Sequence, residues 1–283
     1  MGTAPLQIER EIDMKNIRIV TRADDAGSSH SANLAIRKVV QAGIIKNVSV
    51  MAPGRYVNEA AQLLAGNKNV CFGMHATINA EWAYVKWGPV SDLPRNCGLL
   101  DEKGMFLPSP QHFEKTHPPI ECILKEYDAQ LDKLSREGFN ISYVDSHMFP
   151  EMSIPELDGA TAQWAREKGL LDHMYYYILP PGIERALKDP KQIVPMLRNI
   201  PEGQYFYVTH PSLNTAEMRM TGHDDASGKR VARNRGLETA IFSSKLTKVV
   251  LDRLGIQTLR YSKAVPSNLR GSAEFISRLM NGG

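Results

Sequence analysis

The sequence is poor in cysteine and carries little net charge. Its 283 residues include only Cys71, Cys97 and Cys122, an odd number without C-x-x-C spacing. We therefore expect buried or free thiols rather than a disulfide framework. The net charge is +3 and the basic residues are dispersed along the chain, which argues against a nucleic-acid partner.

Long apolar runs are also missing. No stretch of about 18 apolar residues occurs, so we expect no membrane span, and the first residues lack the apolar core of a signal peptide. A cytoplasmic location is expected, or an exported, periplasmic one if a signal peptide has been removed ahead of Met1-Gly2. No internal repeat, low-complexity tract or linker divides the chain. The sequence thus predicts a flexible N-terminal arm, residues 1–15, and a single domain, residues 16–283.

The chain does contain an alternation of apolar strands and amphipathic helices, and 42% of its residues are apolar. Strands are predicted at residues 17–21, 48–52, 70–75, 143–145, 174–179, 205–210 and 257–261. Helices are predicted at residues 31–41, 57–65, 120–134, 155–168, 183–199, 235–254 and 274–280. This alternation indicates an α/β protein with about seven parallel strands joined by helical crossovers.

Residues 79–118 interrupt the alternation with a long, aperiodic insertion after the third strand. A loop of this length in a compact domain is usually functional or mobile. It holds Trp82 and Trp87, two of the three tryptophans. Aromatic rings suit stacking on sugars, but the same rings can simply pin the loop to the body of the protein. Both interpretations stay open.

Potential metal ligands and proton carriers follow four of the predicted strands. The carboxyl ends of parallel strands in a barrel meet at one mouth, so we expect these side chains to converge. Asp and Gly together are also common in turns, but His at three further strand ends is harder to assign to packing. The residues are Asp24-Asp25, His75, Asp145-Ser146-His147 and His210.

Neighbouring side chains on an extended strand point in different directions. One carboxylate of the Asp24-Asp25 pair can therefore bind a metal ion with His75 and His147 while the other faces a water molecule. Two imidazoles and one carboxylate leave coordination positions open for water and substrate. The second carboxylate would then be a general base, and His210 would be available as a general acid.

The ordered motifs resemble those of the YdjC-like (ChbG/HpnK) carbohydrate deacetylases. The resemblance covers roughly residues 15–262 and rests on four motifs in the same order. Ala23-Asp24-Asp25-Ala26-Gly27 corresponds to A-D-D-F-G, Gly73-Met74-His75-Ala76-Thr77 to G-x-H-L-T, Asp145-Ser146-His147 to D-S-H-x-H, and Thr209-His210-Pro211 to H-P-G.

The resemblance implies a distorted (β/α) barrel of the glycoside hydrolase/deacetylase type and hydrolysis of the acetyl group of an N-acetylated amino sugar or oligosaccharide. By the resemblance, Asp25, His75 and His147 hold one divalent metal ion, Asp24 is the base and His210 the acid. Zinc is expected first, with magnesium, manganese or cobalt as alternatives. A homodimer is the default assembly. Ala26, Phe149 and Ser212 depart from the family motifs and would change the pocket wall, and with it the sugar.

Three further residues could serve the site. Arg22 could contact substrate or, more commonly for such a residue, pair with a carboxylate. Asp145 could orient one of the histidines or make only a hydrogen bond at the strand end. Arg235 could bind substrate, although an i,i+3 ion pair with Glu238 is favoured slightly. The remaining histidines are expected at the surface: His30, His112, His117, His173 and His223.

Two other function classes compete with a deacetylase. A metal-dependent barrel isomerase or aldolase would use similar ligands, but it commonly needs a lysine, a glutamate or a second metal ion for proton transfer at carbon. No such residue stands out at these strand ends. A non-catalytic carbohydrate-binding relative would be expected to lose Asp24 or His210, and both are present.

Overall fold

The computed structural model describes residues 16–222 and 227–271. The expected arm, residues 1–15, and the expected helix at 274–280 lie outside these ranges. Every strand pairing among the described residues is parallel, as predicted. The strands are β1 (Ile17–Ala26), β2 (Asn47–Val50), β3 (Cys71–Ala76), β4 (Ile141–Ser146), β5 (Leu171–Asp172), β6 (Gly203–Thr209) and β7 (Ile256–Leu259).

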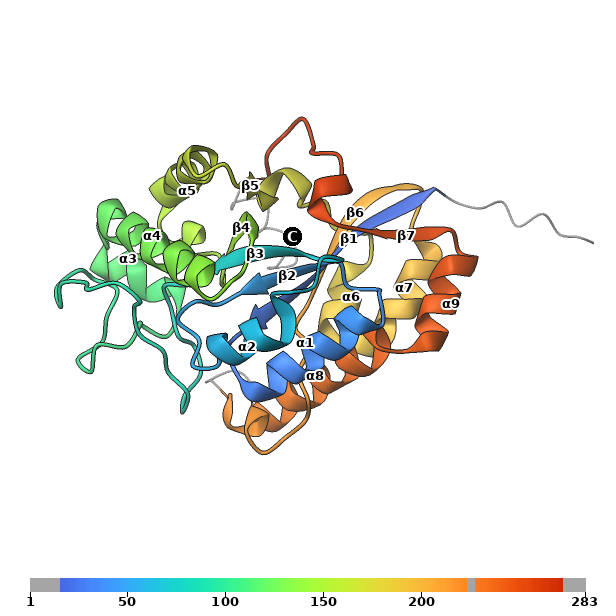
Figure 1. Ribbon diagram of the computed structural model, residues 1–283, viewed down its shortest axis with the longest axis horizontal. Helices are drawn as coiled ribbons and strands as arrows, with labels where there is room; N and C mark the ends of the chain where they lie inside the picture. The colour runs from blue at the N-terminus through green and yellow to red at the C-terminus, as the bar shows by residue number, and fades with distance from the viewer. Residues whose placement is uncertain (1–15, 223–226, 272–283) are drawn as a thin grey trace, which may run out of the picture.

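The seven strands form one open sheet in the order β5-β4-β3-β2-β1-β6, and β7 also pairs with β1. The first and last strands of the described chain therefore lie side by side (Figure 1). The sheet is strongly curled, as seen from the Tyr143 ring of β4 and the Phe206 ring of β6, which come from strands that are not neighbours and both pack on Tyr261. The expected distorted barrel is thus confirmed in the form of a parallel half-barrel.

Helices cover the outer face of the sheet. Helix α1 lies beside both α2 and α8 (Figure 1), and no helix of the described residues is long and apolar enough to cross a membrane. All three cysteines are free thiols, as expected. The α-helices are α1 (His30–Gln41), α2 (Val57–Leu64), α3 (Phe113–Thr116), α4 (Ile120–Arg136), α5 (Pro155–Glu167), α6 (Ile183–Lys188), α7 (Ile193–Asn199), α8 (Gly228–Phe242) and α9 (Lys245–Arg253).

Local capping explains where several helices begin. The Ser29 side chain accepts a hydrogen bond from the backbone of Ala32, so Ser29 is the N-cap of α1, and the helix begins one residue before the predicted start at residue 31. The predicted helix at 235–254 is wrong in its bounds. Helix α8 begins at Gly228 and ends at Phe242. A new helix, α9, then begins, and the side chain of its N-cap Ser244 accepts a hydrogen bond from the Thr247 backbone. Serine competes for backbone hydrogen bonds and therefore favours such a new start.

The predicted strand at 174–179 is also wrong. Residues His173–Tyr176 form a 3-10 helix, η3, and β5 is only Leu171–Asp172. The Asp172 side chain caps η3 by accepting from the Met174 backbone. The apolar residues Tyr176 and Tyr177 that suggested a strand are buried in a cluster on the concave face of the sheet. Residues 183–199 are helical as predicted, in the separate pieces α6 and α7 with a 3-10 turn at Pro190–Gln192 (η4) between them.

Candidate metal and catalytic site

The Asp24-Asp25 pair lies inside the end of β1 and not in a turn after it. The pairing of β1 with β2 shifts register between Ala23 and Ala26, and Asp25 has a left-handed backbone, with φ of 67°. Aspartate tolerates this conformation better than most residues, and a register shift of this kind re-aims side chains. Asp24 keeps the regular alternation and shares a face of β1 with Arg22.

Asp25, His75 and His147 meet at the carboxyl ends of β1, β3 and β4. All three are buried, and each offers a ligand atom within 4.8 Å of the others. The His75 Nε2 and His147 Nδ1 atoms are 3.1 Å apart. The Asp25 Oδ1 atom lies 3.5 Å from His75 Nε2 and 3.7 Å from His147 Nδ1. The structure therefore brings together the three residues expected to bind the metal ion.

The hydrogen bonds around the two imidazoles fit a cation at this place. Asp145 Oδ2 lies 2.6 Å from His75 Nδ1, and Glu81 Oε2 lies 2.9 Å from His147 Nε2. Because a carboxylate accepts the N–H on the outer side of each ring, the inner nitrogens can present lone pairs. Asp25 Oδ1 is buried without a hydrogen-bond partner. Three acceptors thus converge, which suits a divalent metal ion.

Nearby charges set the protonation of this group. Burial alone would raise the pKa of Asp25, but Arg235, His75, His210 and His147 hold it well below its usual range. Burial alone would lower the pKa of His75, yet Asp145 and Asp24 raise it to about 10. Without a cation, His75 therefore carries a second proton, which a metal ion at the inner nitrogen would replace.

Two arginines hold the carboxylates in place. Arg22 donates through Nε and Nη2 to the two oxygens of Asp24, at 2.6 and 2.7 Å, and its Nη2 lies 3.0 Å from Asp145 Oδ2. The expectation that Arg22 pairs with a carboxylate is confirmed. Arg235 donates through Nη1 to Asp25 Oδ2 at 2.6 Å. The prediction that Arg235 pairs with Glu238 is therefore wrong, because the Arg235 guanidinium pairs with Asp25 instead.

Comparison with known proteins gives the family of this chain. Residues 18–253 match the YdjC-like protein family. The chain belongs to the family of YdjC-like proteins. A carbohydrate deacetylase of Thermoanaerobacter pseudethanolicus is 28% identical over 129 residues, which cover 46% of this chain and 49% of the relative. A chitooligosaccharide deacetylase of Klebsiella pneumoniae strain 342 is 27% identical over 153 residues, covering 54% of this chain and 57% of the relative.

The matched segment therefore spans about half the length of these curated relatives. Among solved structures, a proposed cellobiose-phosphate cleavage protein of Enterococcus faecalis V583 superposes with a TM-score of 0.67 at 19% identity. The superposition covers 87% of this chain and 98% of that protein. This likeness concerns the fold, and it supports the half-barrel architecture of the YdjC-like chain.

His210 and Glu238 complete the mouth of the site in this YdjC-like protein. His210 is half-buried at the end of β6, and its charge is one of those that lower the pKa of Asp25. Glu238 accepts from the His210 backbone N–H at 2.6 Å and from the Thr209 hydroxyl at 2.7 Å. The carboxylate expected to pair with Arg235 thus anchors the strand end that carries His210.

His173 is buried, so its expected surface position is wrong. Its Nδ1 atom lies 3.2 Å from Arg22 Nη1, and burial together with the Arg22 charge lowers its pKa to about 3. The neutral imidazole therefore accepts from Arg22. The aromatic residues that follow His173 in the sequence were the available signal of burial. His30 and His112 are exposed as expected, and His223 lies outside the described residues.

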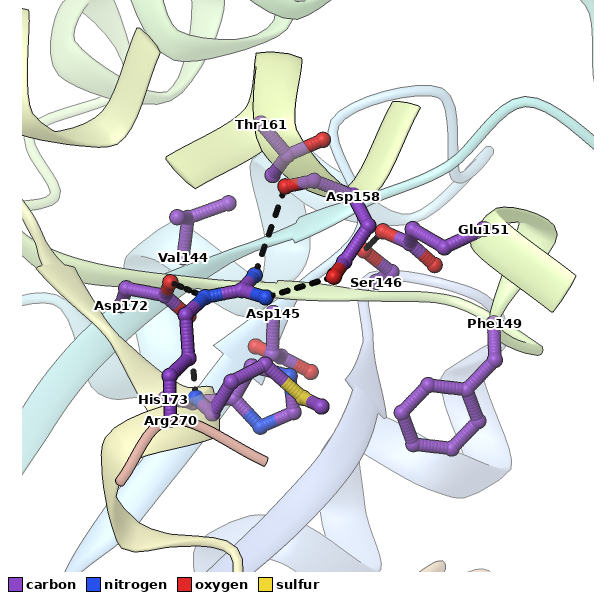
Figure 2. A pocket seen from close by; sticks show the side chains of 11 residues that line it. Val144, Asp145, Ser146, Phe149, Glu151, Asp158, Thr161, Asp172, His173 and Arg270 are labelled. Carbon is purple, nitrogen blue, oxygen red and sulfur yellow. Dashed lines mark hydrogen bonds and ion pairs between the residues drawn. The ribbon is translucent and has the colours of Figure 1, made fainter. Parts of the chain in front are cut away.

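A small pocket is lined by Asp145 together with residues of α5 and the segment around β5. Figure 2 shows Arg270 between Asp158 and Asp172, with ion pairs of 2.7 and 2.6 Å. The pocket has room for about one water molecule and is too small for a sugar. Glu151 also lines it, and burial raises the pKa of this carboxyl to about 7.

The two tryptophans of the insertion are packing residues. Trp82 and Trp87 are 2% and 4% exposed, and their rings meet edge to face at 5.3 Å. The Trp87 indole N–H donates to the Asn79 carbonyl, and the Arg235 guanidinium lies over the Trp82 ring at 5.6 Å. The rings pin the insertion to the body and leave no free face for stacking on a sugar.

The three departures from the family motifs occupy different surroundings. Ala26 and Ser212 are fully buried, so neither forms an exposed wall of the site. Phe149 has a left-handed backbone, with φ of 51°. Its ring stacks on His173 at 6.2 Å and meets Tyr177 edge to face at 5.7 Å. Of the three positions, Phe149 alone packs against a group that contacts Arg22.

Proposed function

We propose that this protein is a metal-dependent carbohydrate deacetylase, which hydrolyses the acetyl group of an N-acetylated amino sugar or oligosaccharide. The observation that carries the proposal is the convergence of Asp25 Oδ1, His75 Nε2 and His147 Nδ1 with the Asp25 oxygen left unpartnered. The relatives named carbohydrate deacetylase and chitooligosaccharide deacetylase support the reaction class.

Asp25, His75 and His147 would hold the metal ion, and their composition favours zinc over magnesium, manganese or cobalt. When bound, a divalent cation supplies Lewis-acid chemistry, which polarises a carbonyl group and makes water nucleophilic near neutral pH. Arg235 keeps one Asp25 oxygen occupied, so the other oxygen is the one available for the ion. Asp145 orients the His75 ring through its Nδ1–H.

Asp24 is the proposed general base. Its two oxygens accept from Arg22, but a carboxylate has about four lone-pair positions, so about two remain, and one of these can take the proton of the attacking water. His210, when protonated, is the proposed general acid for the sugar nitrogen. An amine leaves poorly as an anion, so a proton must reach the nitrogen as the C–N bond breaks.

Acetate release tests the proposal directly. Purified protein is stripped with chelator, reloaded with Zn²⁺, Mg²⁺, Mn²⁺ or Co²⁺, and incubated with matched N-acetylated and O-acetylated sugars of one to several units. We expect release from an N-acetylated amino sugar that disappears with chelator and returns with one of the ions. Release only from O-acetylated sugars would refute the amide assignment, and release unaffected by chelator would refute metal dependence.

A further inference from the structure

We propose that Glu81 is a positioning residue of the metal site. Its carboxylate fixes the ring orientation and tautomer of His147, so that the insertion after β3 contributes to metal affinity. The inference rests on the proposed metal-dependent function and names a residue outside the motifs that suggested it. Glu81 lies in an aperiodic segment, so neither periodicity nor strand position marks it in the sequence.

The geometry assigns different nitrogens of the two histidines to the metal ion. Glu81 Oε2 lies 2.9 Å from His147 Nε2, and the side chains are 11% and 6% exposed. An ionised carboxylate only accepts hydrogen bonds, so His147 Nε2 carries the hydrogen and Nδ1 keeps its lone pair. Asp145 does the converse for His75 by accepting from Nδ1 and leaving Nε2 free. The two carboxylates thus aim two lone pairs at the space beside Asp25 Oδ1.

The protein holds Glu81 in this position from both sides. The Ala80 backbone N–H donates to the Leu107 carbonyl at 2.9 Å, and the Ala83 backbone N–H donates to the Gly222 carbonyl at 2.8 Å. Trp82, the residue after Glu81, is buried. Because the backbone around Glu81 is held, its side chain loses less entropy in making the hydrogen bond, so the contact can order the His147 ring.

The local charges agree with this role. The ion pairs around the site connect four carboxylates, those of Asp24, Asp25, Asp145 and Glu81, with the guanidinium groups of Arg22 and Arg235 through His75 and His147. With both imidazoles neutral, as they would be as metal ligands, four negative charges against two positive ones leave an excess of two, which one divalent cation would neutralise. Removing the Glu81 charge would weaken the attraction for the ion as well as releasing the His147 ring.

The test compares Glu81→Ala, Glu81→Gln and Glu81→Asp with Glu102→Ala, a control at an exposed position of the same insertion. Zn²⁺ affinity is measured by chelator competition, and ¹⁵N NMR of the histidine rings reports which His147 nitrogen carries hydrogen in the zinc-loaded protein. We expect Glu81→Ala to bind zinc roughly 10–100-fold more weakly and to lose the protected Nε2–H signal. Glu81→Gln, whose carbonyl can still accept, should keep that signal with a smaller loss of affinity.

Unchanged zinc affinity and an unchanged His147 ¹⁵N pattern in Glu81→Ala would overturn the inference, as would an equal loss in Glu102→Ala. If Glu81→Ala does not fold, Glu81→Asp decides the matter, because its shorter side chain keeps the charge but withdraws the oxygen from His147 Nε2. Weaker zinc binding with a changed His147 ¹⁵N pattern would then support the inference, and unchanged values of both would overturn it. Neither readout uses a substrate. A wild-type protein that binds zinc but releases no acetate would therefore refute the proposed function alone, whereas a wild-type protein that binds no divalent ion would refute both.

Discussion

The Arg22 guanidinium donates hydrogen bonds to both carboxylate oxygens of Asp24, at 2.6 and 2.7 Å, and both side chains are buried. The contact follows from their spacing, because residues two apart on a strand share a face. A bidentate pair of this kind fixes direction as well as distance. Asp24 is therefore held at one orientation beside the His75–Asp145 pair, which is the accuracy that its proposed role as general base would require.

Asp24→Asn should separate catalysis from metal binding. Asparagine keeps the size of aspartate but cannot accept the proton of water, so kcat should fall by a factor on the order of 10²–10⁴, while metal content stays unchanged. Asp25→Asn is the matched variant, which should lose the metal ion. Steady-state kinetics with metal analysis checks both. A metal-free Asp24→Asn protein beside a metal-loaded Asp25→Asn protein would show that the two roles are exchanged.

His75→Ala and His147→Ala should each bind the metal ion far more weakly than the wild-type protein, because each removes one of three convergent ligand atoms. His112→Ala is the control, since His112 is exposed and belongs to a different part of the chain. Metal content after dialysis against a weak chelator is the measurement. Full occupancy in both site variants would exclude these histidines as ligands.

Trp82→Ala and Trp87→Ala should destabilise the protein. Both rings are buried, and removing a buried aromatic side chain costs about 3–5 kcal/mol of unfolding free energy. Tyr84→Ala is the control in the same insertion, because Tyr84 is 78% exposed and should change stability little. Urea unfolding measures the difference. Unchanged stability with a raised KM would show instead that the indole rings contact substrate.

Glu151 should make stability depend on pH. Burial raises the pKa of Glu151 from 4.5 to about 7, so the folded state keeps the proton in a window where the unfolded chain has lost it. Ionisation of Glu151 therefore lowers the free energy of unfolding as the pH rises from about 4.5 through 7, by roughly 3 kcal/mol once the carboxyl is fully ionised in the folded state.

Glu151→Gln removes this titration and keeps a polar group near Ser146. The difference in unfolding free energy between the variant and the wild-type protein should shift in favour of the variant as the pH rises from 5 to 8. Urea unfolding of the metal-free proteins at several pH values measures it. A difference that does not change with pH would mean that Glu151 is not the group that titrates there.

The sequence by itself determined the alternation of strands and helices, the parallel sheet and the strand ends that carry Asp25, His75, His147 and His210. These properties depend on local periodicity and on the rule that parallel strands end at one edge. The same local patterns failed at residues 174–179, where the capping carboxylate of Asp172 and the burial of the following tyrosines favour a 3-10 turn over a strand.

Only the tertiary structure decided how charged groups that are distant in the sequence pair. Arg235 reaches Asp25 across 210 residues, and Glu81 reaches His147 across 66. Such contacts depend on which side chains folding places within hydrogen-bond distance, and no periodic pattern records them. These neighbours decide which nitrogen of each imidazole keeps its lone pair and which oxygen of Asp25 is occupied. They also bury the faces of Trp82 and Trp87. Ring orientation and charge are set by contact rather than by position in the chain.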